Sequence, residues 1–384
     1  MRALLLAMVL GVVSGVAQAS IIPAAPQLAA KSWVLMDADS GYVLAESNAD
    51  MQVEPASLTK MMTSYILSWE LSKGRVKNSD RVLVSQNAWA QNFPGSSLMW
   101  IEVGKEVSLD DLHRGIIVSS GNDASVAVAE HLAGTESAFA DVMNQHAERL
   151  GMKGSHFVNA HGLPDPDHYT TAADMATLAR AIIVDFPQDY TLYAEKYFVY
   201  NNIRQPNRNR LLWRDSSVDG LKTGHTESAG YCLVASAKRK GMRLISVVMG
   251  TSGEEARARE TQSLLTWGFR FFESFRLYDR GETLSTLEVW GGTTDQVNLG
   301  TGGAVYLTVP RGQRSNIKAN VQVDDVLRAP IKAGDVIGSL QIRLNDELLQ
   351  EEPLVALNDV EQAGFLGRSW DSLRLFFRNL LNRI

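Results

Sequence analysis

Residues 53–71 read Val-Glu-Pro-Ala-Ser-Leu-Thr-Lys-Met-Met-Thr-Ser-Tyr-Ile-Leu-Ser-Trp-Glu-Leu, and this stretch predicts the helix around which the chain is organised. Its apolar residues recur at helical spacing, and Pro55 and Gly74 suit the first turn and the C-terminal cap. Ser57 and Lys60 are three residues apart, so they lie on one face of the helix and can share a hydrogen bond. A lysine whose charged form is disfavoured can accept the proton of such a serine and make it a nucleophile.

The Ser-x-x-Lys pair is weak evidence by itself, because about one or two such pairs are expected by chance in a chain of this length. A second pair, Ser315-Asn-Ile-Lys318, lies in a polar stretch that we expect to be β-rich. The alternative for either pair is an ordinary solvated turn, and the two can be told apart by their structural context.

Composition and the first residues limit the class of protein. The chain has 384 residues, enough for two domains, and its net charge of −6 without a basic block argues against a nucleic-acid partner. Residues 1–19 carry one positive charge, an apolar run and an Ala-x-Ala ending, which predicts a secretory signal peptide cleaved after Ala19. The alternative, an uncleaved anchor, would need a longer apolar run. Cys232 is the single cysteine, which excludes an intrachain disulfide and predicts a buried thiol.

The order of predicted elements indicates an α/β (α+β) domain, namely an antiparallel sheet with an inserted helical lobe. The late strands follow one another through a tight turn, which favours antiparallel pairing with the early strands. The predicted strands lie in 32–45, from Asp219 onward, in 231–238 and in 243–250, and the predicted helices in 109–149, 172–184 and 254–275.

Three further boundaries follow from changes in pattern. We predict a catalytic domain at 20–276 and a small all-β domain at 277–357, whose default role is that of a spacer. Residues 363–384 are predicted to form an amphipathic helix that lies in the interface of an anionic membrane. Its apolar face comprises Leu366, Trp370, Leu373, Phe377, Leu380, Leu381 and Ile384. The alternative is a helix packed on the protein's own core.

Two further motifs carry polar side chains. Ser119-Ser120-Gly121-Asn122 lies in a predicted loop between two helices, where its side chains can face a cleft or, alternatively, cap a helix. Lys222-Thr223-Gly224 lies on a predicted strand, which is either a plain edge strand or a substrate-binding strand. Gly224 has no side chain and allows a ligand or another backbone to approach closely.

The order Ser-x-x-Lys, Ser-Gly-Asn, Lys-Thr-Gly is the signature of penicillin-recognising serine acyltransferases. With these motifs, His161-Gly-Leu, Asp219-Gly-Leu-Lys-Thr-Gly-His-Thr and Leu265-Thr-Trp-Gly-Phe-Arg-Phe-Phe-Glu, the chain resembles the low-molecular-mass penicillin-binding proteins, the bacterial D-alanyl-D-alanine carboxypeptidases. The resemblance extends over essentially the whole chain.

This resemblance implies roles for individual residues. Ser57 would attack the carbonyl between two terminal D-alanines, Lys60 would accept its proton, and Ser120 would relay a proton to the leaving amine. Asn122 would hold a substrate amide. The acyl chain and the terminal carboxylate would contact Lys222, Thr223, Gly224 and His225.

The resemblance also implies an arginine near the substrate carboxylate, for which Arg257 is the first choice and Arg259 the alternative. The backbone N–H groups of Ser57 and His225 are the expected oxyanion hole. His161 is expected to make structural hydrogen bonds rather than to act in catalysis.

The resemblance implies a peptidoglycan stem peptide ending in D-Ala-D-Ala as substrate, β-lactam antibiotics as covalent ligands, and no cofactor or metal. The protein would be exported and bound peripherally to the periplasmic face of the inner membrane through residues 363–384. The alternatives are a β-lactamase or endopeptidase of the same fold, or a non-enzymatic cell-wall scaffold. The loop with Asp165 and Asp167 lacks the Glu-x-x-x-Asn arrangement of class A β-lactamases, which favours the carboxypeptidase.

Overall fold

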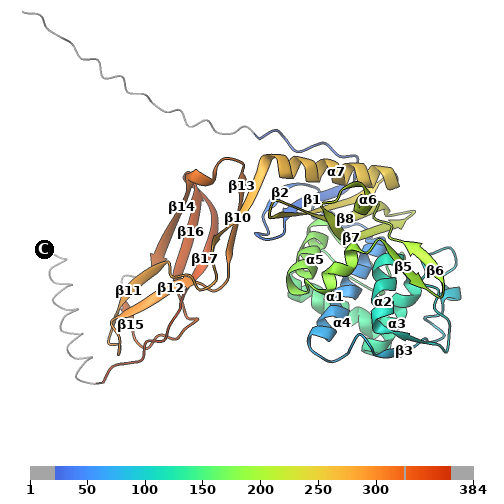
Figure 1. Ribbon diagram of the computed structural model, residues 1–384, viewed down its shortest axis with the longest axis horizontal. Helices are drawn as coiled ribbons and strands as arrows, with labels where there is room; N and C mark the ends of the chain where they lie inside the picture. The colour runs from blue at the N-terminus through green and yellow to red at the C-terminus, as the bar shows by residue number, and fades with distance from the viewer. Residues whose placement is uncertain (1–21, 324–325, 365–384) are drawn as a thin grey trace, which may run out of the picture.

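The computed structural model describes residues 22–323 and 326–364. Its first domain contains a five-stranded sheet with the order β2-β1-β9-β8-β7, in which every neighbouring pair is antiparallel, as predicted. Figure 1 shows that the sheet joins the start of the chain to the strands that follow the helical lobe. The strands are β1 (Ser32–Asp37), β2 (Val43–Ser47), β7 (Val218–Thr226), β8 (Gly230–Arg239) and β9 (Met242–Thr251).

Both faces of this sheet are covered, because successive side chains of a strand point to opposite faces. In β1, Val34 and Met36 belong to the core of the helical lobe, whereas Trp33 and Leu35 belong to a second core that includes Leu264 of α7 (Glu254–Phe271). Figure 1 shows α7 along one face of the sheet and the lobe against the other. β7 is an edge strand, so its free edge is the side on which a ligand can lie.

The helical lobe surrounds α1 (Lys60–Ser72), whose apolar residues Met61, Met62, Tyr65 and Ile66 are at most 1% exposed. The predicted helices of residues 109–149 and 172–184 are confirmed. They are α2 (Leu109–Arg114), a π-helical segment (Gly115–Ser119), α3 (Asn122–Ala133), α4 (Glu136–Leu150) and α5 (Ala172–Asp185). Smaller elements are β3 (Arg81–Leu83) paired with β4 (Glu106–Ser108), β5 (Tyr197–Tyr200) paired with β6 (Ile203–Pro206), and α6 (Leu211–Arg214).

The helix α7 is shorter than the helix predicted at 254–275. It ends at Phe271, and Phe272 begins β10 (Phe272–Tyr278), which pairs antiparallel with β13 (Val305–Pro310). The prediction was wrong here because closely spaced aromatic residues satisfy the apolar pattern of a helix and of a strand alike.

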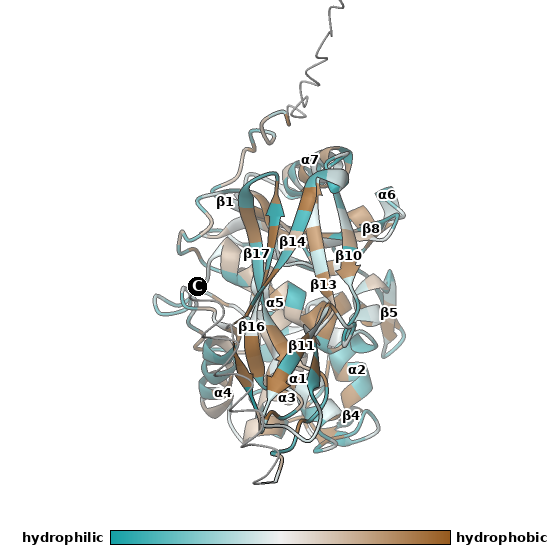
Figure 2. Cartoon of the chain, turned by 90° about the vertical axis from the view of Figure 1, so that its left-hand side faces the viewer, coloured by the Kyte–Doolittle hydropathy of each residue, from teal (hydrophilic) through white to brown (hydrophobic). Residues whose placement is uncertain are grey.

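The second domain consists of strands, with one 3-10 turn (Arg314–Asn316) in its described part. Its six-stranded sheet has the order β14-β16-β17-β12-β11-β15. Residues of β14 alternate between half-buried and exposed, and Figure 2 shows brown and teal segments in succession along the strands of this domain. The predicted all-β character is confirmed. The strands not yet given are β11 (Ser285–Trp290), β12 (Gln296–Thr301), β14 (Ile317–Val323), β15 (Leu327–Arg328), β16 (Val336–Leu344) and β17 (Glu347–Ala356).

Arg311 is the residue directly after β13, and its side chain connects the second domain to the end of α7 through hydrogen bonds. Its Nη2 atom donates to the carbonyl oxygens of Phe269 and Phe272, each over 2.8 Å, and its Nε atom donates to that of Arg270 over 3.3 Å. A guanidinium at this position compensates the unsatisfied carbonyl groups and the negative end of the α7 dipole.

Candidate active site

The Ser-x-x-Lys motif begins in a 3-10 turn (Ala56–Thr59) that leads directly into α1. The turn starts with Pro55 and with Ala56 at φ +48°, a conformation that is uncommon for a residue with a side chain. Ser57 is partly exposed and Lys60 is 1% exposed. The motif therefore presents its hydroxyl at the surface and keeps its amine in the interior.

Lys60 lies among three oxygen atoms. Its Nζ atom is 3.1 Å from Ser57 Oγ, and it donates to Asn122 Oδ1 over 2.7 Å and to the carbonyl oxygen of His161 over 2.6 Å. Burial, and secondly the positive charge of Arg208, lower the pKa of Lys60 to about 7.

The Ser-Gly-Asn motif lies where the π-helical segment meets α3. Ser120 has φ +60°, and Gly121 is the N-cap residue of α3, without a side-chain capping bond. The capping alternative is therefore not realised. The side chains of Ser120 and Asn122 are instead directed at the lysines of the other two motifs, over 2.9 Å to Lys222 and 2.7 Å to Lys60.

Lys222 of the third motif is buried on the edge strand β7, and its Nζ atom donates to Ser120 Oγ. Burial, followed by the charges of Lys60, Arg208 and Arg257, holds the pKa of Lys222 well below its usual range. Two residues later, an added Cβ on Gly224 would meet the carbonyl oxygen of Pro55 at 2.9 Å. The glycine therefore allows β7 to approach the Ser57 turn, as its lack of a side chain suggested.

These motifs border a cleft of about 450 Å³. His225 stacks on Tyr231 with ring centroids 3.9 Å apart, and Arg257 is buried, with its Nη1 atom donating to the carbonyl oxygen of Gly224 over 3.2 Å. The residues that line the cleft are Ser57, Gly95, Ser96, Ser97, Ser120, Asn122, His161, Gly162, Leu163, Arg208, Thr223, Gly224, His225, Thr226, Glu227, Tyr231, Glu254 and Arg257.

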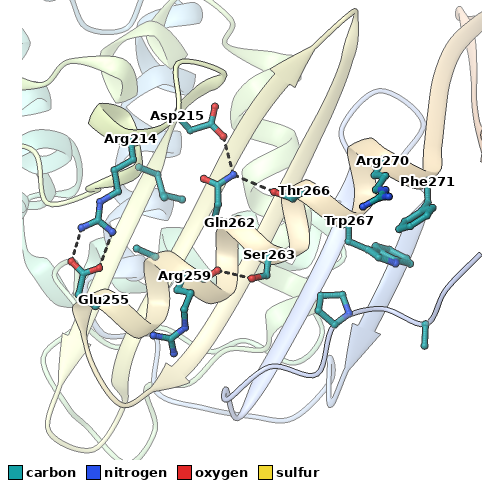
Figure 3. Close-up of a pocket in the computed structure, with 14 residues that line it drawn as sticks. Arg214, Asp215, Glu255, Arg259, Gln262, Ser263, Thr266, Trp267, Arg270 and Phe271 are labelled. Atoms are coloured by element: carbon teal, nitrogen blue, oxygen red, sulfur yellow. Dashed lines mark hydrogen bonds and ion pairs between the residues drawn. The ribbon is translucent and has the colours of Figure 1, made fainter.

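Arg259 lies elsewhere. Figure 3 shows it on the outer face of α7, in a larger groove of about 850 Å³ that does not include Ser57. Its side chain is 66% exposed and pairs with Glu260 over 2.9 Å. Of the two candidate arginines, Arg257 is the one that lines the cleft.

Two other candidates lie away from the cleft or make structural contacts. Lys318 is 3.8 Å from Asp346, and Ser315 contacts Asn316, so this second Ser-x-x-Lys pair makes no Ser–Lys contact among the interactions described. His161 Nδ1 accepts from the Leu163 N–H over 3.1 Å, and Nε2 lies 3.3 Å from Glu136 Oε1. Burial lowers the pKa of His161 to about 3, so the ring is neutral.

The comparisons with known proteins agree with this geometry. A family model described as D-alanyl-D-alanine carboxypeptidase matches residues 19–253, and a model described as the C-terminal domain of penicillin-binding protein 5 matches residues 272–362. The chain belongs to the serine-type D-alanyl-D-alanine carboxypeptidase family. The predicted family is confirmed, and so is the predicted fold class for the two domains; the predicted tail helix lies almost entirely outside the described residues.

Individual relatives cover between 64% and 92% of this chain. D-alanyl-D-alanine carboxypeptidase DacC of Escherichia coli is 46% identical over 358 residues, which are 92% of this chain and 90% of the relative. The crystal structure of penicillin-binding protein 5 from Haemophilus influenzae matches with a TM-score of 0.85 at 44% identity, over 88% of this chain and 100% of that chain. Penicillin-binding protein D2 from Listeria monocytogenes, solved in an ampicillin-bound form, matches with a TM-score of 0.57 at 28% identity, over 64% of this chain and 100% of that chain.

Arg208 is a residue of the carboxypeptidase cleft that the sequence did not reveal. It follows the β5–β6 hairpin and lies between two buried asparagines. Asn207 Nδ2 donates to the carbonyl oxygen of Glu195 over 3.0 Å, and Asn209 Nδ2 donates to that of Gly220 over 2.9 Å. The asparagines anchor the segment so that Arg208 enters the cleft, and no local pattern marks it.

Ser96 was also missed, although the run Pro94-Gly95-Ser96-Ser97 is a recognisable loop signal. Its Oγ accepts from Asn122 Nδ2 over 3.0 Å, so both ends of the Asn122 amide are engaged before any substrate is bound. In the described part of the chain, no group of three or more His, Cys, Asp or Glu side chains is arranged to hold a metal ion.

Proposed function

We propose that this protein removes the terminal D-alanine from peptidoglycan stem peptides ending in D-alanyl-D-alanine, through an acyl-enzyme on Ser57. The observation that carries the proposal is the position of Lys60, whose Nζ atom lies 3.1 Å from the Oγ atom of Ser57, a residue that lines the cleft. β-Lactams would acylate the same serine, in keeping with the ampicillin-bound relative.

The surroundings of Lys60 suit a neutral amine. A neutral amine has two N–H donors and one lone pair, whereas the ammonium has three donors. Asn122 Oδ1 and the carbonyl oxygen of His161 accept two N–H bonds, over 2.7 and 2.6 Å. The lone pair then faces the Ser57 hydroxyl and accepts its proton while Oγ forms the bond to the substrate carbonyl carbon.

Ser120 is suited to serve the leaving group. Because its oxygen accepts a hydrogen bond from Lys222 Nζ, its own O–H remains available to the substrate. As the C–N bond of the terminal D-alanine breaks, Ser120 relays to the departing amine the proton that Lys60 took from Ser57, so that Lys60 is neutral again. Water then attacks the ester carbonyl; its hydroxyl stays on the acyl carbon, its proton goes to Ser57 Oγ, and the free serine is restored.

The substrate carboxylate would bind at the cationic end of the cleft, where Arg257, Arg208 and Thr223 meet. Burial holds the pKa values of both arginines below their usual range, and the charge of Arg208 lowers that of Arg257 further. A carboxylate between the two guanidinium groups would relieve this repulsion and could form paired hydrogen bonds. This site selects for peptides with a C-terminal carboxylate.

The oxyanion of the tetrahedral intermediate would accept from the backbone N–H groups of Ser57 and His225. These groups belong to the Ser57 turn and to β7, which approach each other at Gly224. Because backbone donors on two packed segments require little reorganisation, they stabilise the charge that develops during acylation.

The test is acylation by penicillin, followed by mass spectrometry and peptide mapping. The adduct should appear on Ser57, and Ser57→Ala should abolish both labelling and D-alanine release. Ser315→Ala is the matched control, since it changes the second Ser-x-x-Lys pair, and it should alter neither. An adduct that maps to another serine contradicts the proposal.

We also propose that the protein is exported and acts at the periplasmic face of the inner membrane. The supports are the signal-peptide pattern of residues 1–19 and the amphipathic pattern of residues 363–384, nearly all of which lie outside the described residues. Within the described ranges, no helix has the length and apolar character needed to cross a bilayer. Residues 20–276 would act as the catalytic domain and 277–357 as the spacer that carries it above the membrane.

A further inference from the structure

His168 lies outside the three motifs, on the loop that precedes α5, and is 2% exposed. Its ring has two hydrogen-bonding partners. The backbone N–H of Val158 donates to Nδ1 over 3.1 Å, and Nε2 lies 2.7 Å from Thr59 Oγ1. Phe157 packs edge-on against the ring with centroids 5.7 Å apart. The imidazole is therefore held on three sides, one of which is the Ser57 turn.

The direction of each hydrogen bond follows from the donor groups. A backbone N–H can only donate, so Nδ1 of His168 accepts, and in the neutral ring the proton is on Nε2. Nε2–H then donates to Thr59 Oγ1. The hydroxyl of Thr59 in turn donates to the carbonyl oxygen of Ala56 over 2.9 Å. Val158, His168, Thr59 and Ala56 thus form one chain of hydrogen bonds with a single consistent direction.

The chain ends on the peptide group that carries the Ser57 N–H. The peptide between Ala56 and Ser57 is planar, so its C=O and N–H directions are coupled. Gly162 closes the other side of this carbonyl, because an added Cβ there would lie 1.8 Å from the Ala56 oxygen. With Ala56 at φ +48°, the plane needs such support to keep its orientation.

We propose that His168 is a positioning residue for acylation, which acts through Thr59 to fix the Ala56–Ser57 peptide plane and thereby aims the Ser57 N–H at the oxyanion. The inference rests on the proposed function, since it assigns a task within that reaction. His168 touches no substrate; its effect is on the direction of a donor that stabilises the transition state.

The charge state of His168 is compatible with this role. Burial lowers the pKa of His168 to about 4, and the negative charge of Asp165 opposes this shift only in part. The ring therefore stays neutral near pH 7, with Nδ1 able to accept from Val158.

The experiment compares two pairs of variants. His168→Phe keeps a ring but removes both nitrogens, whereas His168→Gln retains one donor and one acceptor. Thr59→Val keeps the branched shape but removes the hydroxyl, whereas Thr59→Ser retains it. Acylation by penicillin should slow about 10- to 100-fold in His168→Phe and Thr59→Val, because a misdirected donor or a small displacement has effects of this size. The Gln and Ser variants should recover most of the rate.

Two further readouts separate positioning from simple structural support. The dissociation constant of penicillin before acylation should stay within about twofold of wild type in all variants that show a native circular dichroism spectrum. A boronic acid analogue of D-alanine, whose tetrahedral adduct places an oxygen in the oxyanion hole, should lose affinity by the same factor as the acylation rate. His156→Phe is the matched control, because His156 Nδ1 donates to the carbonyl oxygen of Asp167 instead, and its acylation should be unchanged.

The inference is wrong if His168→Phe and Thr59→Val acylate at the wild-type rate, or if only the dissociation constant changes. If His168→Phe fails to fold, the acylation rates of Thr59→Val and Thr59→Ser test the inference in its place. If the wild-type protein forms no adduct at Ser57, the proposed function itself is wrong. This result comes from the wild-type protein alone, so it can be told apart from a failure of the inference about His168.

Discussion

Lys222 Nζ donates a hydrogen bond to Ser120 Oγ over 2.9 Å, although the two residues are 102 positions apart. Ser120 belongs to the helical lobe and Lys222 to the edge strand of the sheet, so this bond crosses the line along which the two layers meet. The residues proposed to act in catalysis are therefore positioned by how the lobe packs on the sheet, and substitutions that shift this packing should affect the reaction without removing a reacting group.

The base assignment predicts a pH dependence. Lys60 must be neutral to accept the Ser57 proton, and its pKa is about 7. As the pH falls from 8 to 6, the neutral fraction falls from about 0.9 to about 0.1, so the acylation rate should drop about tenfold. Lys60→Arg should abolish acylation at every pH in this range, because arginine stays protonated. Stopped-flow measurement with a chromogenic cephalosporin checks both; near-wild-type acylation by Lys60→Arg would remove Lys60 from the role of base.

Arg257 is predicted to recognise the terminal carboxylate of the substrate. Arg257→Ala should raise the KM for a D-Ala-D-Ala peptide about tenfold or more, with a much smaller effect on a peptide whose carboxylate is amidated. Arg259→Ala, on the outer face of α7, is the matched control and should behave as wild type. If amidation penalises wild type and Arg257→Ala equally, the carboxylate binds elsewhere in the cleft, and Arg208 is then the next candidate.

Gly224→Ala tests the close approach of β7 to the Ser57 turn. The new Cβ would lie 2.9 Å from the Pro55 carbonyl oxygen and 3.2 Å from Leu58, so one segment must move. We expect an acylation rate lower by about tenfold or more and a loss of about 1–3 kcal/mol in the free energy of unfolding. Gly302→Ala is the control, since an added Cβ there meets nothing within 4 Å. Unchanged acylation in Gly224→Ala would show that this contact does not position the site.

The tail is predicted to anchor the protein. Deletion of residues 365–384 spares the hydrogen bond from the Ala363 N–H to the Gly291 carbonyl oxygen, which closes the described part of the second domain. The truncated protein should move from the membrane fraction to the soluble periplasm and keep its activity on a small peptide. Full-length protein with Trp370, Leu373 and Phe377 changed to serine should do the same. Retention of the truncated protein on membranes would overturn the anchor.

The three motifs could be found in the sequence because each combines a local structural signal with a chemically distinctive set of side chains. Ser57 follows a proline at a helix start, Ser120 and Asn122 flank a glycine at a helix boundary, and Lys222 lies on a strand. The antiparallel pairing of the sheet could also be predicted from the sequence, because two strands joined by a tight turn pair in antiparallel orientation.

The remaining site residues depend on contacts between distant parts of the chain. Arg208 and His168 lie in segments without regular periodicity, and what brings them to Ser57 is the folding of these segments onto the lobe. The end of α7 was mispredicted for a related reason: Phe272 is a strand residue because it pairs with Pro310, a partner 38 positions away that local spacing does not indicate.

Arg311 has a mechanical consequence. Because its guanidinium clamps the last turn of α7, and Arg257 lies near the first turns of the same helix, the joint between the domains is continuous with the wall of the cleft. A flexible linker between the domains would set only the distance between the cleft and the membrane. A rigid joint would also fix the direction in which the cleft faces. The second domain would then set the orientation of the catalytic domain as well as its distance from the membrane.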